Sequence, residues 1–341
     1  MTGKKDFGKL TFSLNHLSEE TKMFESWYKD GQWDSGELVP FRPIALSPAA
    51  NILNYGQGIF EGMKAYRSVK ERIVMFRPEE NAARFARSGA MLAMAVVNEQ
   101  KFMDAVWKTV LANVDYIPDS DGGKYSFYLR PVAIGTEAML GVKAAKEYLF
   151  YIYGSPVGPY FDKVGVVSLM VTDMHRAAAN GIGSAKAVSN YAATMPPRQQ
   201  AIEHGYDGAL FLDTVHNSYV EEAGAANVFV LMKDNTLVTP EVKSILPGIT
   251  RDSIIRVARD MFGLKVEERP LSIDELCKDA KECFVCGTGA IVTSVNKILW
   301  KGEEYDFSGT DFALSHRVYD KITGIQLERD EDPYGWITEI D

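Results

Sequence analysis

The stretch "NGIGSAKAVSNYAATMPP", residues 180–197, holds a single lysine among glycine, alanine and serine. Lys186 is followed five residues later by Tyr191. Core segments of this size usually carry Leu, Val or Ile, whereas small neighbours leave room for a flat ring against the backbone. A lysine can form a Schiff base with an aldehyde only when its amine is deprotonated, which burial or a nearby positive charge favours. The stretch therefore indicates either a reactive lysine or an ordinary solvated loop lysine.

The composition is that of a globular protein, with 46% hydrophobic and 24% charged residues among 341. This length predicts two domains, each with its own core. A net charge of −9 without a Lys/Arg-rich block argues against nucleic acid or an anionic membrane surface as a partner. No apolar run reaches the roughly 20 residues of a membrane span, and residues 1–10 lack the apolar centre of a signal peptide. We therefore expect a cytoplasmic protein without membrane segments.

Two of the three cysteines, Cys283 and Cys286, form a CxxC within "KECFVCGTG". This spacing occurs in zinc and redox sites. The segment reads as a strand, however, so the two side chains point to opposite faces, and no second Cys/His pair lies nearby. We expect two core thiols and no metal site.

The pattern of apolar residues predicts helices over 76–94 and 99–117 and strands over 125–135 and 147–156. The second half is richer in strands, at 207–213, 217–223, 227–240 and 264–272, the third as a hairpin turning at Asp234–Asn235. Further helices are expected from Thr250, after Ser272 and over 310–328. This order of elements favours an α+β fold over alternating βαβ units.

Two segments have the features of anion-binding backbone. In "SILPGITRDS", residues 244–253, Gly248 ends a loop and a helix begins at Ile249 and Thr250, whose N–H groups and hydroxyl suit a phosphate. "CGTGA", residues 286–290, is a Gly–Thr–Gly turn that could act in the same way through Thr288. Each could equally be an ordinary helix cap or hairpin turn.

The segment "VEEAGAANVF", residues 220–229, supplies a carboxylate. Glu221 and Glu222 are adjacent on a predicted strand, so only one of them is expected to point inward. A buried carboxylate needs a partner, and a protonated ring nitrogen would serve; the alternative is that both are solvated at a strand end. A reactive lysine, two phosphate-binding termini and an inward carboxylate together suit pyridoxal 5′-phosphate (PLP).

Several segments together resemble the branched-chain amino-acid aminotransferases, which are PLP enzymes of fold type IV. These segments are "YGQGIFEGMKAYR", "FRPEENAARFARS", "YLRPVAIG", "SPVGPYF", "SAKAVSNYAAT" and "ILPGITRDS". The resemblance covers nearly the whole chain, and "QGIFEGMKAY" and the Lys-to-Tyr spacing are its more specific parts. It implies a small α/β domain over 1–155, an interdomain loop over 156–168 and a larger PLP-binding pseudo-barrel domain over 169–341. It also implies a homodimer, or an assembly of dimers, in which the partner subunit completes each active site.

The resemblance implies transfer of the amino group of leucine, isoleucine and valine to 2-oxoglutarate, with Lys186 as the lysine that binds PLP covalently. The other cofactor contacts would be Arg84, Ile249, Thr250 and Thr288 at the phosphate, Tyr191 at the phenolic oxygen, Glu222 at the ring nitrogen and Leu246 against the ring. The substrate pocket would contain Phe7, Phe60, Tyr128, Tyr160, the backbone of Gly289 and Ala290, and Arg130 for the side-chain carboxylate of glutamate. Tyr55 and residues 140–142 would approach the neighbouring subunit's site.

Two positions depart from the family pattern. Many relatives have Gly-Thr-x-Asn after the ring-nitrogen Glu, whereas this chain has Ala225 in place of Thr and so lacks one hydroxyl at the pocket floor. The redox CxxC of the mammalian members corresponds to Ala290 and Thr293, so Cys283 and Cys286 do not inherit that role.

Other functions fit parts of the same pattern. Fold type IV also includes D-amino-acid aminotransferases, whose chains typically lack the long stretch before "YGQGIFEG", and an aminodeoxychorismate lyase. A PLP-binding protein without turnover and a globular protein without PLP are the remaining alternatives.

Overall fold

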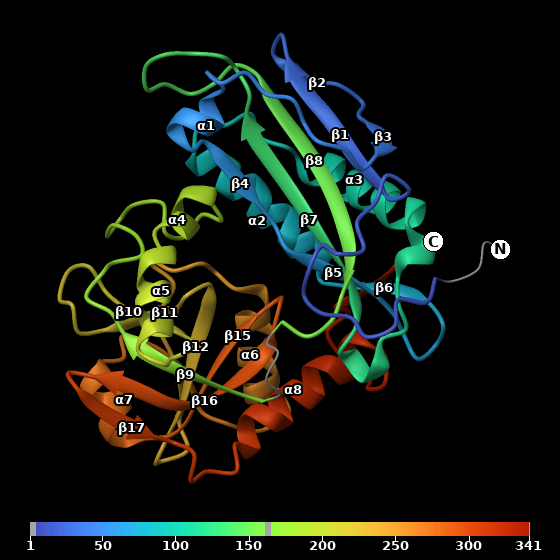
Figure 1. Ribbon diagram of the computed structural model, residues 1–341. Coiled ribbons are helices and arrows are strands. Elements are labelled where there is room, and N and C mark those ends of the chain that lie inside the picture. Colours follow the sequence, from blue (N-terminus) through green and yellow to red (C-terminus); the bar gives the residue numbers. More distant parts are fainter. Residues whose placement is uncertain (1–4, 161–164, 341) are drawn as a thin grey trace. The chain divides into compact units, whose positions relative to one another are not determined.

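A computed structural model describes residues 5–160 and 165–340 of the protein (Figure 1). The chain forms two compact units. The first is built from Met1–Asp162, Ala185–Ser189 and Gly324–Asp341, and the second from Lys163–Ser184 and Asn190–Thr323. The segment that carries Lys186 therefore folds with the N-terminal half of the chain. The linear domain boundaries at 155 and 169 stay a prediction.

The first unit contains one antiparallel sheet. Its strands are β1 (Lys22–Lys29), β2 (Gln32–Trp33), β3 (Glu37–Pro40), β4 (Gly58–Phe60), β5 (Met63–Arg67), β6 (Ile73–Phe76), β7 (Ser126–Gly135), β8 (Tyr148–Val157) and β18 (Ile337–Glu339). The main order is β18-β6-β5-β7-β8-β1-β2, with β3 beside β1 and β4 beside β7. The long β7–β8 pairing runs from Ser126 opposite Val157 to Gly135 opposite Tyr148.

Helices α2 (Pro78–Met91) and α3 (Glu99–Ala112) pack together on one face of this sheet (Figure 1). Proline in the first turn and two acidic residues behind it favour the start of α2. At the start of α3, the Asn98 side chain accepts the N–H of Lys101 at 2.8 Å. The rings of Phe85, Phe102 and Phe150 then pack at centroid distances of 5.0 to 6.1 Å in the core. The unit also contains α1 (Asn51–Tyr55) and the 3-10 helices η1 (Val114–Tyr116) and η2 (Asp121–Gly123).

Strands of the second unit close into a barrel in the order β11-β10-β9-β16-β15-β12, because β11 also pairs with β12. The strands are β9 (Val166–Val171), β10 (Gly208–Leu212), β11 (Val220–Ala223), β12 (Ala226–Met232), β15 (Ala280–Gly287) and β16 (Ile291–Trp300). Strands β13 (Leu237–Thr239), β14 (Val266–Glu268) and β17 (Glu303–Asp306) extend this sheet. Strand β9 pairs in parallel with both of its neighbours, so the barrel is mixed.

The helices that complete the second unit are α4 (Val188–Ala192), α5 (Met195–Glu203), α6 (Ile249–Asp260), α7 (Ile273–Asp279) and α8 (Ala313–Gln326), of which α4 begins and α8 ends in segments of the first unit. Helix α7 begins at the predicted cap, where the Ser272 hydroxyl accepts the N–H of Glu275 at 3.0 Å. At the start of α8, the buried carboxylate of Glu282 accepts the N–H groups of Leu314 and Ser315.

The expected α+β fold is confirmed. The predicted helices over 76–94, 99–117 and 310–328 contain α2, α3 and α8, and α6 begins one residue before Thr250. The hairpin predicted at Asp234–Asn235 connects β12 and β13, with Asn235 at a φ of 65°. Cys283 and Cys286 are free thiols buried in β15, as expected for core residues, and burial raises the pKa of both.

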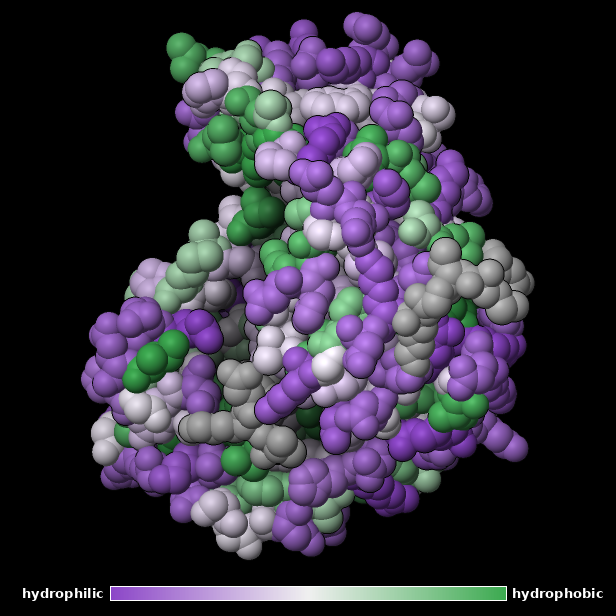
Figure 2. Space-filling model, turned by 45° about the vertical axis from the view of Figure 1, so that its right-hand side comes forward, coloured by the Kyte–Doolittle hydropathy of each residue, from purple (hydrophilic) through white to green (hydrophobic). Residues whose placement is uncertain are grey.

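The surface is largely hydrophilic, as a content of 24% charged residues predicts. On the face shown in Figure 2, hydrophilic side chains predominate and hydrophobic ones occur in separate groups. Among the helices that the structure describes, none combines the length and the apolar character that a membrane crossing requires.

Candidate active site

Lys186 lies in the first unit, where its backbone is joined to β4 and α2. Its carbonyl accepts the N–H of Phe60 at 3.1 Å, and its N–H donates to the hydroxyl of Ser88 at 3.0 Å. The side chain is half-buried, and its Nζ lies 4.8 Å from the centroid of the Phe60 ring. The lysine is therefore held by main-chain hydrogen bonds and directed at an aromatic face.

Arg84, on α2, forms a buried bidentate pair with Glu61. Its Nε and Nη2 donate to the two carboxylate oxygens at 2.7 and 2.8 Å, and Asn81 donates to the same carboxylate at 2.8 Å. Glu61 is fully buried, which raises the pKa of its carboxyl, but the charges of Arg84 and Lys186 and the hydrogen bonds outweigh burial, so the pKa is lowered. The pair fixes the guanidinium of Arg84 in one orientation.

Arg130 and Tyr128 lie on the same face of β7, as the spacing of two residues predicts. Arg130 Nη2 donates to the Tyr128 hydroxyl at 3.1 Å, and its guanidinium carbon lies 4.7 Å from the centroid of the Phe60 ring. A guanidinium beside two aromatic rings offers both an apolar wall and donors for a carboxylate.

Phe12, which the sequence analysis did not single out, contacts Tyr128 and Tyr160. The ring of Phe12 packs edge-on against Tyr128 and Tyr160, at 5.1 and 4.9 Å. Phe7 instead packs against His16 and Tyr116, at 5.3 and 6.1 Å. The structure thus brings Tyr128 and Tyr160 together through Phe12.

Tyr55 ends α1 and holds an exposed loop. Its hydroxyl accepts the N–H of Gly141 at 2.7 Å. The flanking Leu140 and Val142 are each 89% exposed. This loop therefore exposes two apolar side chains at the surface of the first unit.

In the second unit, Glu222 is buried on β11 with donors around its carboxylate. Oε1 accepts the Asn227 amide at 3.0 Å and the N–H of Leu246 at 3.2 Å. Arg176 Nε lies 2.8 Å from Oε2 without its N–H aimed at that oxygen, so this contact is an ion pair rather than a hydrogen bond. These partners fix the orientation of the carboxylate.

Glu221, the neighbour of Glu222, is also buried, at 5% exposure against 3%. The expectation that only one of the two is inward, and the alternative that both are solvated, are therefore wrong. The reason is that the segment 244–246 contacts both carboxylates: the Ser244 hydroxyl donates to Glu221 and Leu246 donates to Glu222. Burial raises the pKa of Glu221, while the Ser244 hydrogen bond and the charge of Arg176 act in the opposite direction.

The same segment leads into α6, and at Gly248 its backbone lies close to the Asn227 side chain. A Cβ on Gly248 would lie 2.0 Å from Oδ1 of Asn227, although the φ of −70° suits any residue. Helix α6 then begins at Ile249, and Thr250 is 8% exposed. The first N–H groups of a helix have no acceptor within the helix, and a helix terminus of this kind suits an anion; the contact of this one and of the Thr250 hydroxyl with a phosphate stays a prediction.

Thr288, Gly289 and Ala290 form the turn between β15 and β16. The turn ends at Ile291, whose φ of 63° is unusual for a β-branched residue, and such strain concentrates at binding sites. The segment is thus a hairpin turn, and its contact with an anion stays a prediction. Tyr191 lies half-buried in the short helix α4.

Sequence reasoning missed the residues that hold the predicted ones in place. Glu61 holds Arg84 and is itself held by Asn81, while Arg176 and Asn227 hold Glu222. A lone acid within the apolar stretch "GIFEGM" was a usable signal for Glu61, whereas Arg176 follows no pattern. The amine, the guanidinium, the carboxylate and the α6 terminus are donors and acceptors of the kinds that PLP requires, so the residues fit this group.

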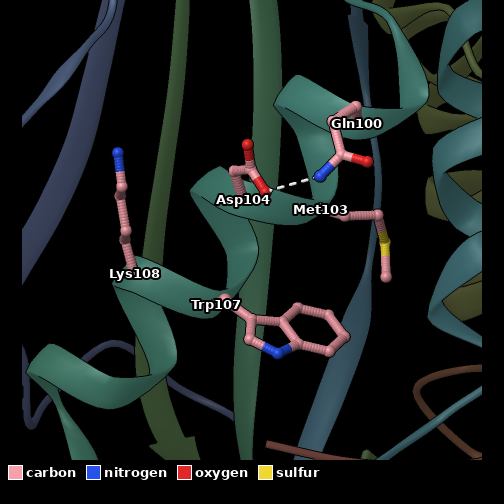
Figure 3. A pocket seen from close by; sticks show the side chains of 5 residues that line it. All are labelled: Gln100, Met103, Asp104, Trp107 and Lys108. Atoms are coloured by element: carbon pink, nitrogen blue, oxygen red, sulfur yellow. Dashed lines mark hydrogen bonds between the residues drawn. The ribbon is translucent and has the colours of Figure 1, made fainter.

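A separate surface hollow of about 400 Å³ lies along α3 (Figure 3). Its lining consists of Gln100, Met103, Asp104, Trp107 and Lys108, all from this one helix. Gln100 donates to Asp104 at 2.8 Å across its edge. None of the predicted site residues lines it, so it is not the candidate active site.

Residues 58–298 match the amino-transferase class IV family model, and the chain belongs to that family. The chain is 42% identical to branched-chain-amino-acid aminotransferase 5, chloroplastic, from Arabidopsis thaliana, over 98% of this chain and 80% of that protein. It is 40% identical to the branched-chain-amino-acid aminotransferase of Helicobacter pylori, over 93% of both chains. Within class IV, it is therefore a member of the branched-chain-amino-acid aminotransferases.

Solved structures agree with this relationship. The branched-chain amino acid aminotransferase of Escherichia coli superposes with a TM-score of 0.77 at 28% identity, over 94% of this chain and 99% of that one. Another branched-chain amino acid aminotransferase, solved with pyridoxamine 5′-phosphate, superposes with a TM-score of 0.78 at the same identity and coverage. The fold is accordingly that of fold type IV.

Proposed function

We infer that the protein uses PLP to transfer the amino group of L-leucine, L-isoleucine and L-valine to 2-oxoglutarate. The products are the branched-chain 2-oxo acids and L-glutamate, formed in a ping-pong mechanism. The observation that carries this inference is the 42% identity to a branched-chain-amino-acid aminotransferase over 98% of the chain. The pyridoxamine 5′-phosphate in a related structure supports the cofactor.

The proposed cofactor residues bind different parts of PLP. They are Lys186, Arg84, Tyr191, Glu222, Leu246, Ile249, Thr250 and Thr288. When bound, PLP supplies an electron sink for the charge that develops at the substrate Cα. Arg84 offers the phosphate a planar, pre-oriented fork, and Glu222 favours a protonated ring nitrogen. The Lys186 amine moves the proton at Cα.

The proposed substrate residues combine aromatic walls with one cation. They are Phe7, Phe60, Tyr128, Arg130 and Tyr160, with the backbone of Gly289 and Ala290. The rings suit an apolar branched side chain, and Arg130 beside the Tyr128 hydroxyl suits the second carboxylate of 2-oxoglutarate. Phe12 joins this set because its ring packs against Tyr128 and Tyr160.

The assembly we propose is a homodimer in which Tyr55 and residues 140–142 of each chain approach the partner's active site. Support comes from the exposure of Leu140 and Val142 in a loop that the Tyr55 hydroxyl holds in place. The cytoplasm is the proposed compartment. Three free cysteines agree with a reducing environment.

The function is tested by the absorption spectrum of the PLP-loaded protein before and after addition of substrate. We expect L-leucine, and not D-alanine, to convert the bound cofactor to its pyridoxamine form, and 2-oxoglutarate to return it with release of glutamate. Conversion by D-alanine alone would indicate a D-amino-acid aminotransferase, and pyruvate release from aminodeoxychorismate would indicate a lyase. Bound PLP without any conversion would contradict turnover.

Replacing Lys186 by alanine tests the central residue. Loss of a general base typically removes about 10²–10⁴ in rate, and the covalent link to the cofactor is lost as well. Lys186→Ala is therefore expected to have no measurable steady-state transamination. Near-normal turnover by this variant would move the role to another lysine.

A further inference from the structure

A second buried carboxylate accompanies Glu222, and the reaction described above gives it no role. Glu221 is 5% exposed, and the Ser244 hydroxyl donates to its Oε1. Its Oε2 is buried without a hydrogen-bond partner among the residues that the structure describes. A buried carboxylate with an unsatisfied oxygen is costly, so its presence requires a compensating interaction.

Ser244 and Arg176 connect the two carboxylates. The Ser244 hydroxyl donates to Glu221, while its carbonyl accepts Arg176 Nη2 at 2.8 Å. The same nitrogen donates to the carbonyl of Gly183 at 3.1 Å, and Arg176 Nε lies 2.8 Å from Glu222. Arg176 is therefore held by Ser244, which contacts Glu221, and it lies against Glu222 itself.

The charges in this cluster do not cancel. Arg176 is 6% exposed and sits against Glu222, so by itself it would offset the charge that a protonated ring nitrogen requires. An ionised Glu221 supplies a second negative charge to the same guanidinium. Among these three groups the net charge is negative, which is the sign that favours a protonated ring nitrogen.

We propose that Glu221 is a positioning residue for transamination. Its negative charge offsets the positive charge of Arg176, and Ser244 holds the two groups together, so that the charge of Glu222 remains available to the ring nitrogen of the cofactor. The proposal rests on the proposed function, in which Glu222 faces that nitrogen. Glu221 touches neither substrate nor cofactor in this scheme. It acts on the protonation of the ring through Arg176 and Glu222.

The cluster also gives the reaction a defined dependence on pH. The groups that act on Glu221 are Ser244, Arg176, Asp213 and His175, from three segments of the second unit because His175 and Arg176 are adjacent. Burial, the largest influence, raises the pKa of Glu221 above its ordinary value. As the pH is lowered, Glu221 is therefore protonated at a higher pH than an exposed glutamate. We expect kcat to fall as Glu221 loses its charge.

Two variants test the proposal on the PLP-loaded protein. Glu221→Gln removes the charge, and Ser244→Ala removes the hydroxyl but keeps the carbonyl that accepts Arg176. The matched control is Glu282→Gln, which neutralises a carboxylate that is 3% exposed and caps α8 away from this cluster. The first measurement is the NMR chemical shift of the isotope-labelled ring nitrogen of PLP as a function of pH. The second is kcat as a function of pH.

In both test variants we expect the pKa of the ring nitrogen to fall by about one unit, which is a tenfold change in its protonation equilibrium. We expect kcat to fall about tenfold with the KM for leucine within about twofold, and the acid limb of the kcat profile to disappear in Glu221→Gln. The control should lose thermal stability without either change.

The proposal would be overturned if Ser244→Ala and Glu221→Gln kept the wild-type pKa of the ring nitrogen and the wild-type kcat. It would also be overturned if Glu282→Gln changed both quantities by the same amounts as the test variants. If Glu221→Gln does not fold, Ser244→Ala decides. A wild-type protein that binds PLP but does not transaminate would refute the proposed function instead, while the NMR titration would still decide the role of Glu221.

Discussion

Replacing Glu61 by glutamine tests the buried pair that orients Arg84. Both guanidinium contacts are shorter than 3 Å and Glu61 has no exposed surface, so the variant leaves a buried cation facing a neutral amide. Breaking such a pair typically costs about 3–5 kcal/mol. With an unfolding entropy of about 2.1 cal/mol/K for each of 341 residues, this loss lowers Tm by about 4–7 °C.

The assay is calorimetry of the PLP-free protein, with Glu80→Gln as the control. Glu80 pairs with Arg77 at 3.4 Å and is 50% exposed, so its loss is expected to cost less than about 1 kcal/mol.

The pH dependence gives a second measurement on the same variant. The pKa of Glu61 is lowered in the folded protein, so its stabilisation is present above the unfolded-state pKa of about 4.3 and is lost as pH falls through the folded-state value. The difference between wild type and variant should therefore shrink in acid. A destabilisation no larger than that of Glu80→Gln, or one that stays constant into acid, would refute this account of the pair.

Three other substitutions probe the site directly. Arg130→Met should lower kcat/KM for glutamate and 2-oxoglutarate by roughly 30-fold to several-thousand-fold, and that for leucine by less than about tenfold, because only the dicarboxylates lose a charge partner; equal losses in separate half-reactions would mean that Arg130 only supports the fold. Glu222→Gln should still bind PLP but convert L-leucine slowly in single-turnover spectra, and a wild-type rate would remove it from the ring nitrogen. Phe12→Ala should raise the KM for leucine by about tenfold or more with kcat little changed, since burying a phenylalanine side chain contributes about 1.5–3 kcal/mol; an unchanged KM would place Phe12 outside the pocket.

Local patterns in the sequence predicted what lies close along the chain. The alternation on β7 puts Tyr128 and Arg130 on one face, and the "SIDE" motif places the cap of α7 at Ser272. The partners of the site residues come from distant segments, and no local pattern encodes them. Glu61 and Arg84 meet from a strand end and a helix 23 residues apart, and Arg176 reaches Glu222 from another segment.

The error at Glu221 has a specific physical cause. Strand alternation states that neighbouring side chains point to opposite faces, and it is silent about what covers each face. Here the segment 244–246 reaches both acids of β11, so both are buried. Phe12 escaped prediction for a similar reason, since its contacts with Tyr128 and Tyr160 join parts of the chain far apart in sequence.

The close approach of Gly248 to Asn227 couples the mutations that can accumulate at these two positions. A side chain at 248 requires the Asn227 side chain to move or to be shorter, because the added Cβ would overlap its oxygen. Either change displaces the amide that donates to Glu222 and to the carbonyl of Leu246. A change at either position therefore disturbs the hydrogen bonds of the other, so we expect substitutions at 227 and 248 to occur together even though the backbone at 248 would accept any amino acid.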